Sequence, residues 1–197
     1  VQVFNRGNTA GPSHQITAQA EKASPTFGTP VKLTLDGKKI WTNAPFPTRP
    51  VTALVDGDIT NFFHSQWQTT VAMPHYLVID LGEEVSAIKF RSTNTNRPAD
   101  SSWKTINLYT SDDYNPAQWF DGVKFINGDS VDISQAGTHK ETTLTELPDG
   151  TSEVYNSEII PLSKPSRYLW FEVTETTKGT SYFALGEIYK CSMVVPE

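Results

Sequence analysis

Several short stretches of the chain alternate between apolar and polar residues, which is the period of a β-strand with one buried face. Residues 88–91, 106–109 and 168–173 all alternate in this way. In the last stretch the leucine, phenylalanine and valine would point to one face, and the tyrosine, tryptophan and glutamate to the other. Residues 76–79 instead form a continuous apolar run between a proline and a glycine, as expected for a strand covered on both faces.

Breaks between these stretches are frequent. Thirteen prolines and twelve glycines interrupt the chain at short intervals and leave little room for long helices. No helical period is sustained, and no internal repeat is present. The sequence therefore predicts an all-β fold, built as an antiparallel β-sandwich.

Length and composition are those of a soluble globular domain with 37% hydrophobic and 19% charged residues, and no apolar run approaches the length of a membrane span. A net charge of −6 argues against binding to nucleic acid or to anionic lipid, which both rely on clustered lysine and arginine. We expect residues 1–13 to be a linker or N-terminal extension and 14–197 to be a single domain. Residues 24–50 would be an insertion, with a small hairpin about Asp36-Gly37, and 112–157 contain a second long loop.

Asp56 and Asp58 flank Gly57, so two carboxylates stand two residues apart on a turn. Calcium takes six to eight oxygen ligands, including carboxylates and backbone carbonyls. The spacing is not that of an EF-hand, so any cation here would need ligands from elsewhere in the fold. Taken alone, the segment is better described as a solvated turn, because Asp and Gly dominate turns for local reasons.

Five further segments follow the Asp-Gly-Asp turn in an order typical of a known family. They are residues 74–82, 86–90, 106–113, 166–173 and 183–191. Together they resemble the discoidin, or coagulation-factor type C, domain and its bacterial relatives, the family 32 carbohydrate-binding modules. Residues 16–20 look like the first strand of that family. The resemblance implies a jelly-roll β-sandwich with its ligand loops at one end and, in many bacterial members, a structural calcium.

The resemblance also implies ligands for that calcium. Matched position by position, they are the carbonyls and side chains of Ala53, Asp56, Asp58, Asn61, Gly186 and Glu187. The ion would hold the last strand against the first long loop. The alternative is that Glu187 is hydrogen-bonded or ion-paired without a metal.

A sugar site would combine aromatic rings with a few polar groups that fix orientation. The aromatic residues available in loops are Trp41, Phe46, Phe62, Trp103, Trp119, Tyr182 and Phe183. The family resemblance favours a site made of Phe62, Asn94, Asn96, Arg97, Tyr182 and Phe183. Galactose-binding relatives often carry a histidine where this chain has Ile59, which puts galactose in doubt. We expect Trp67 and Trp170 to lie in the core or on a strand face, and His64 to be a structural residue at a strand end.

Three classes of function remain open. The first is a non-catalytic carbohydrate-binding module of a secreted, cell-surface or periplasmic bacterial protein, in which this chain would be one part of a larger surface protein. The second is a protein-interaction or structural module on the same fold, and the least favoured is a small hydrolase, because no catalytic motif is present. The single cysteine, Cys191, cannot form a disulfide within the chain and receives no role. Neutral sugars carry no charge for salt to screen, so glycan binding is expected to tolerate moderate salt.

Overall fold

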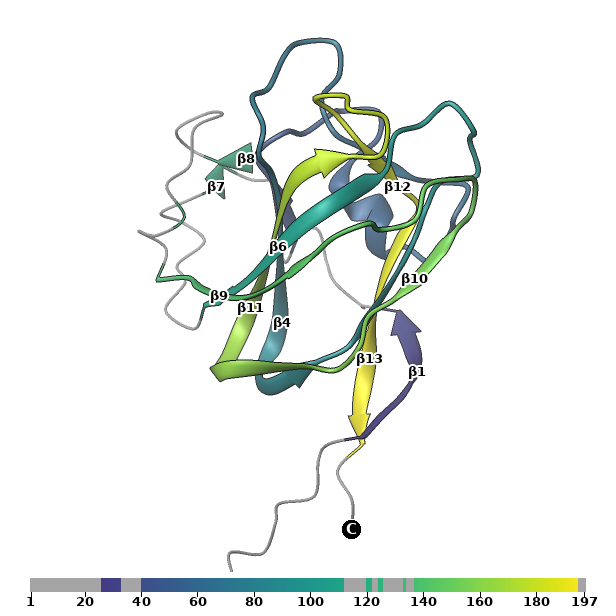
Figure 1. The fold of residues 1–197 in the computed structure, drawn as a ribbon. Helices are drawn as coiled ribbons and strands as arrows, with labels where there is room; N and C mark the ends of the chain where they lie inside the picture. The colour runs from purple at the N-terminus through teal and green to yellow at the C-terminus, as the bar shows by residue number, and fades with distance from the viewer. Residues whose placement is uncertain are drawn as a thin grey trace, which may run out of the picture.

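The protein folds as a β-sandwich (Figure 1). The computed structural model describes residues 26–32, 40–111, 120–121, 124–125, 133 and 137–194. Every strand pairing within these ranges is antiparallel. The predicted all-β sandwich is therefore confirmed. The proposed linker, the first strand at 16–20, the Asp36-Gly37 turn and Trp119 lie outside the described residues.

One layer is a five-stranded sheet built around two long strands. In spatial order its strands are β2 (Ile40–Thr42), β4 (His75–Ile88), β11 (Ile160–Thr176), β6 (Trp103–Ser111) and β9 (His139–Leu144). The central strand β11 pairs with β4 and β6, with Phe171 opposite both Leu77 and Leu108. Both neighbours pair with it from Tyr168 to Val173, and most of that segment is buried.

The other layer is a four-stranded sheet. Its strands, again in spatial order, are β1 (Thr26–Lys32), β13 (Glu187–Val194), β5 (Phe90–Thr93) and β10 (Val154–Asn156). Two small ladders complete the described structure. They are β3 (Phe63–His64) with β12 (Ala184–Leu185), and β7 (Phe120–Asp121) with β8 (Lys124–Phe125).

The expected hairpin between 32 and 41 is not formed by the strands on either side of it. Strand β1 pairs with β13, whereas β2 pairs with β4 in the other sheet. The chain thus passes from one layer to the other across this region. The reason is that each of the two strands completes an edge of a different sheet.

Alternate residues of β11 enter two different hydrophobic clusters, as the alternation in the sequence predicts. Leu169, Phe171 and Val173 belong to the main hydrophobic cluster between the sheets. Tyr168 and Trp170 belong to a second cluster, which includes Trp41, Tyr76 and Val78. Leu77 and Ile79 lie in the first cluster, so the run 76–79 is buried on both faces. The continuous apolar run is explained by these two separate clusters.

Three connections gather at the end of the sandwich opposite the C-terminus (Figure 1). They are the segment between β3 and β4, the loop between β5 and β6, and the loop between β11 and β12. A short 3₁₀ helix, η1 (Val51–Val55), lies near the same end and buries four of its five residues. No helix in the described ranges has the length and hydropathy to cross a membrane.

Candidate functional site

A cavity of about 260 Å³ opens among these loops. We call it the aromatic cavity, and its lining residues are Phe46, Thr48, Arg49, Phe62, His64, Trp67, Arg97, Ala99, Asp100 and Tyr182. These residues come from five connecting segments and the short strand β3, spread along the sequence from residue 46 to residue 182. The lining combines aromatic rings with two arginines and one carboxylate, which is the mixture expected of a site for a polar small ligand.

Four rings form one connected group along the cavity. Phe46 makes edge contacts with His64 and Trp67, at 6.3 and 5.8 Å between ring centroids. His64 also approaches Tyr182, at 5.5 Å. The side chain of Trp67 remains 51% exposed, an unusual state for so large an apolar group. A half-exposed indole beside other rings offers a flat surface on which a ligand can stack.

The short β3–β12 ladder positions this group. His64 lies opposite Ala184, and Phe63 lies opposite Leu185. Next to the ladder, Ser65 is bonded twice to Phe183, because its amide donates to the Phe183 carbonyl and its hydroxyl accepts from the Phe183 amide. These bonds fix the backbone on which His64 and Tyr182 are carried.

The histidine ring has a defined hydrogen-bond role. Nδ1 of His64 lies 2.6 Å from the carbonyl of Ser65. A carbonyl can only accept, so Nδ1 carries a proton and donates. In the neutral ring, Nε2 is then left as an acceptor, suited to a hydroxyl donor.

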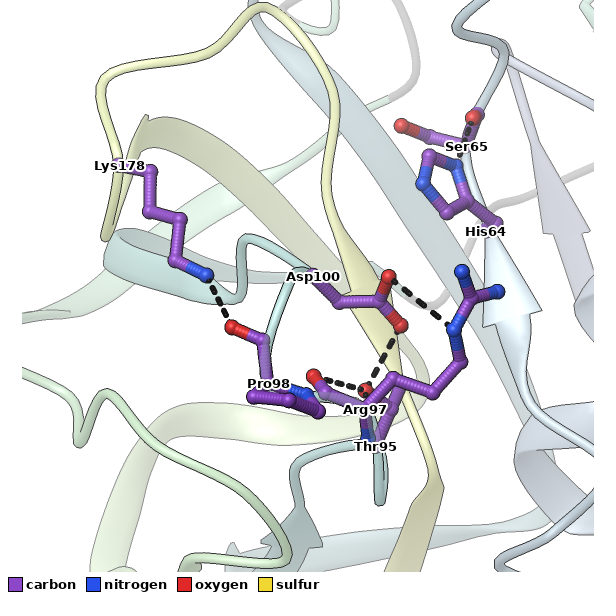
Figure 2. A network of polar contacts seen from close by, with 7 residues as sticks. All are labelled: His64, Ser65, Thr95, Arg97, Pro98, Asp100 and Lys178. Atoms are coloured by element: carbon purple, nitrogen blue, oxygen red, sulfur yellow. Dashed lines mark hydrogen bonds and ion pairs between the residues drawn. The ribbon is translucent and has the colours of Figure 1, made fainter.

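Polar contacts hold the loop between β5 and β6, as Figure 2 shows. The Asp100 carboxylate accepts from the Thr95 hydroxyl at 2.8 Å and lies 3.8 Å from Nε of Arg97. Lys178 donates to the carbonyl of Pro98 and ties this loop to the one after β11. Asp100 is only 7% exposed, whereas the Arg97 side chain is 53% exposed. The loop thus presents an exposed guanidinium group beside a buried carboxylate.

Two arginines approach the same ring in the cavity. The guanidinium carbon of Arg49 lies 4.1 Å from the centroid of the Phe62 ring, and that of Arg97 lies 5.4 Å from it. Cations favour the face of an aromatic ring because of its quadrupole. Phe62 itself is 2% exposed, so it acts as a floor beneath the arginines.

The structure separates the residues predicted to bind sugar into two groups. Phe62, Arg97 and Tyr182 line the cavity, and Asn96 is exposed on the same loop as Arg97. The prediction is wrong for Phe183, whose ring is fully buried against Phe63 and Trp103. It is also wrong for Asn94, which is buried and donates its side-chain amide to the carbonyls of Pro148 and Gly150.

The remaining aromatic candidates divide in the same way. Phe46 lines the cavity, whereas Trp41 and Trp103 are buried. Trp170 is buried as expected. The expectation that Trp67 lies in the core or on a strand face is wrong, because it falls between β3 and β4 and half of its surface is exposed at the cavity. His64 does end a strand and also lines the cavity. Ile59 packs against Gly186 and is not a lining residue.

The residues proposed to bind calcium lie around a second feature, the turn that follows η1. The Asp56 carboxylate accepts from the Asp58 amide at 2.8 Å and from the Asn61 side-chain amide. The Asp58 carboxylate turns back on its own loop and accepts from both the amide and the hydroxyl of Thr60. These bonds to Thr60 lower the pKa of Asp58. All of these hydrogen bonds lie within residues 56–61.

Glu187 reaches this turn from the start of β13, 130 residues away in sequence. Its Oε1 accepts from the Gly57 amide at 2.7 Å, and its side chain is fully buried. Its Oε2 is buried and has no hydrogen-bond partner among the described residues. Burial, and then the neighbouring Asp56 carboxyl, raises the pKa of Glu187 to about 8. A buried carboxylate with one unsatisfied oxygen is costly unless a proton or a cation satisfies it.

The side chains at this turn offer oxygen atoms, which are the ligand type that a hard cation such as calcium prefers. Carboxylate oxygens of Asp56 and Glu187 are adjacent, and the Asn61 amide presents its oxygen in place of its nitrogen after a half-turn about χ2. No group of three or more histidine, cysteine or acidic side chains gathers anywhere in the described residues. The remaining ligands would therefore have to be backbone carbonyls, of which Ala53 and Gly186 are the candidates.

Comparison with known proteins gives a likeness in structure alone. No protein-family model matches the sequence, and no curated protein matches it. CpGH89CBM32-5 from Clostridium perfringens, solved with GalNAc-β-1,3-galactose, superposes with a TM-score of 0.59 at 12% identity, over 78% of this chain and 94% of that one. A putative chitobiase fragment from Bacteroides thetaiotaomicron gives 0.59 at 19% identity, over 86% and 95%. The family 32 module of C. perfringens NanJ, solved with galactose, gives 0.53 at 12% identity, over 78% and 92%. At these identities the likeness shows a common fold, the β-sandwich that the sequence resemblance to family 32 modules implies.

Proposed function

We propose that this chain is a non-catalytic carbohydrate-binding module that takes a sugar into the aromatic cavity. The observation that carries the proposal is Trp67, whose half-exposed ring borders a cavity that also contains Arg97 and His64. The apolar face of a pyranose would stack on this ring, while the arginine donates to sugar hydroxyls and Nε2 of His64 accepts from one. The common fold with modules whose solved structures hold galactose adds support.

Substitution of the exposed ring tests this proposal. The wild-type chain is applied to a broad glycan array, and the best hit is titrated by calorimetry against wild type, Trp67→Ala and Trp67→Phe. We expect Trp67→Ala to lose roughly tenfold in affinity, taking as a guide the about 1–3 kcal/mol that a nucleic-acid base gains by stacking on an aromatic ring. Trp67→Phe should recover part of the loss because it restores a flat ring.

Ile159→Ala is the matched control. Ile159 is also an exposed large apolar residue, at 42%, and it does not line the cavity. Its substitution should leave glycan affinity unchanged. Equal affinity in wild type and Trp67→Ala, or the absence of any hit on the array, would contradict the carbohydrate site and favour a protein-interaction module.

We further propose that the turn at 56–61 binds one structural calcium with Glu187. The support is the buried, unsatisfied Oε2 of Glu187 beside the Asp56 carboxyl. The cation would replace the missing donor and join the start of β13 to the turn. Ligands would come from Asp56, Glu187, Asn61 and Asp58, with the carbonyls of Ala53 and Gly186.

Melting curves test the calcium site. A ligand that binds only the folded state raises its stability by mass action, so calcium should raise the melting temperature and a chelator should lower it. Asp56→Ala should remove most of that difference, whereas Asp149→Ala, an exposed aspartate outside the turn, should not. Identical curves for the calcium-loaded and exhaustively chelated protein would rule out the site.

We also infer that the chain is part of a larger bacterial protein that is secreted or held at the cell surface. The support comes from the compared modules, which are from bacteria, and one of which is a fragment of a putative chitobiase. Detection of the native protein in the culture medium or on the cell surface, against its absence from both, decides this point.

A further inference from the structure

With two arginines, the aromatic cavity carries more positive charge than a site for a neutral sugar requires. Arg97 and the acceptor Nε2 of His64 already supply a donor and an acceptor for hydroxyl groups. Arg49 adds a second guanidinium beside the same Phe62 ring. The chain as a whole carries a net charge of −6, so this local excess of positive charge runs against its overall balance.

Arg49 is not used by the fold as an ion-pair partner. Among the described residues no carboxylate forms an ion pair with it, and its side-chain contact is the one with the Phe62 ring. Its backbone, by contrast, is held firmly. Its amide donates to the Phe46 carbonyl, and its carbonyl accepts from the His64 amide. A fixed backbone between Pro47/Thr48 and Pro50 therefore presents a cation whose charge is not neutralised.

Arg97 is only partly neutralised. Its Nε lies 3.8 Å from Asp100, a long contact, and the other Asp100 oxygen is engaged by the Thr95 hydroxyl. Figure 2 shows the guanidinium extending past Asp100 toward the strand that carries His64. Arg49, Arg97 and Asp100 together leave one net positive charge in the cavity when His64 is neutral.

We propose that the sugar bound in the aromatic cavity is acidic, with its oxyanion, a uronic acid carboxylate or a sulfate ester, between Arg49 and Arg97. Both arginines line the same cavity, and their guanidinium carbons lie 4.1 and 5.4 Å from one ring centroid, so the two carbons are at most about 9.5 Å apart and an oxyanion bound between them would face both. Guanidinium groups pair with such oxyanions through two parallel hydrogen bonds, which are stronger than bonds between neutral groups. The inference rests on the proposed carbohydrate site and specifies its ligand class.

The test compares three sugars that differ only at C6. They are methyl β-galactoside, the corresponding galacturonide and the 6-sulfated galactoside, each titrated into the full chain by calorimetry. We expect at least one acidic sugar to bind roughly tenfold more tightly than the neutral one, as charge-assisted hydrogen bonds imply. The preference should fall between about 50 mM and about 300 mM NaCl, because salt screens exposed charges. Whichever acidic sugar binds more tightly identifies the source of the oxyanion.

Two variants test whether the preference for an acidic sugar comes from the aromatic cavity. Arg49→Gln should bring the ratio of acidic to neutral affinity close to one. Arg91→Gln removes the same charge from β5, where Arg91 donates to Asn156 outside the cavity, and should leave the ratio unchanged. An unchanged ratio in Arg49→Gln would overturn the assignment.

The two proposals fail in different ways. If the neutral galactoside binds as tightly as both acidic ones, the carbohydrate site stands and the acidic preference is wrong. If none of the three binds and the glycan array is also blank, the carbohydrate site itself is wrong, and the acidic preference falls with it.

Discussion

The buried carboxyl of Glu187 leads to a prediction about stability and pH in the calcium-free protein. In the folded chain its pKa is raised to about 8, first by burial and then by the Asp56 carboxyl, against an ordinary value of 4.5. Between these two pH values the folded state holds a proton at Glu187 that the unfolded state has released. Folding therefore becomes less favourable as pH rises through this window, and the loss is complete above the folded pKa.

The size of the effect on stability follows from the pKa shift of Glu187. One pKa unit corresponds to about 1.4 kcal/mol, so a rise from 4.5 to about 8 corresponds to about 5 kcal/mol of unfolding free energy. That is a large fraction of the stability of an ordinary domain. Because the side chain is fully buried, solvent does not screen this penalty.

Denaturant unfolding in the presence of chelator, from about pH 5 to about pH 9, measures the effect. The comparison is between wild type and Glu187→Gln, which keeps the shape and the acceptor for the Gly57 amide but does not titrate. Groups other than Glu187 titrate in both proteins, so the difference between the two pH profiles isolates this carboxyl. Wild type should lose about 4 kcal/mol more than the variant over this range, because part of the full loss falls below pH 5.

Calcium should change the wild-type profile and not that of Glu187→Gln. A bound cation favours the ionised carboxylate, so its stabilising effect should grow as pH rises. Parallel profiles for wild type and Glu187→Gln in chelator would refute the reasoning, since they would show that burial does not penalise the charge at this position.

Two further variants test local geometry by unfolding measurements. Gly186→Ala should lose about 1–3 kcal/mol, because its Cβ would lie 3.0 Å from both the Asn94 carbonyl and Cγ1 of Ile59; a fully stable variant would contradict the tight approach. Asn94→Ala should lose about 1–3 kcal/mol, because the carbonyls of Pro148 and Gly150 lose their donor. Asn96→Ala, on the exposed side of the same loop, should have no effect and serves as its control.

The fold could be predicted because strand periodicity records burial directly. In 168–173 alternate residues enter two different clusters, and the sequence shows this as alternation of apolar types. The same local rule cannot say which of two neighbours faces a site. Tyr182 and Phe183 are adjacent aromatics, yet one lines the cavity and the other is fully buried. Both were predicted to bind sugar, and only the backbone register of the β3–β12 ladder separates them.

The errors at the cavity have identifiable causes. The sequence places Trp67 in the core or on a strand face because it lies inside a family-like segment, although its neighbours Gln66, Gln68 and Thr69 are polar and indicate exposure. Arg49 has no local signal, since it lies in a proline-rich connector and meets Phe62 only through the tertiary fold. His64 is expected to be structural because a histidine at a strand end is more often structural than a ligand, and the tertiary fold brings it to the cavity.

The proposed cation turn and the aromatic cavity share one piece of backbone. Residues 56–61 lead directly into Phe62, Phe63 and His64, so the turn fixes where the floor of the cavity begins. On the other side, β12 pairs with β3 and is followed at once by Gly186 and Glu187. Glu187 bonds back to Gly57, which closes a ring of contacts around the β3–β12 ladder. Only two residue pairs hold that ladder, so its stability depends on what secures the chain on either side. A cation between Asp56 and Glu187 would therefore preorganise the rings of the cavity without touching the sugar.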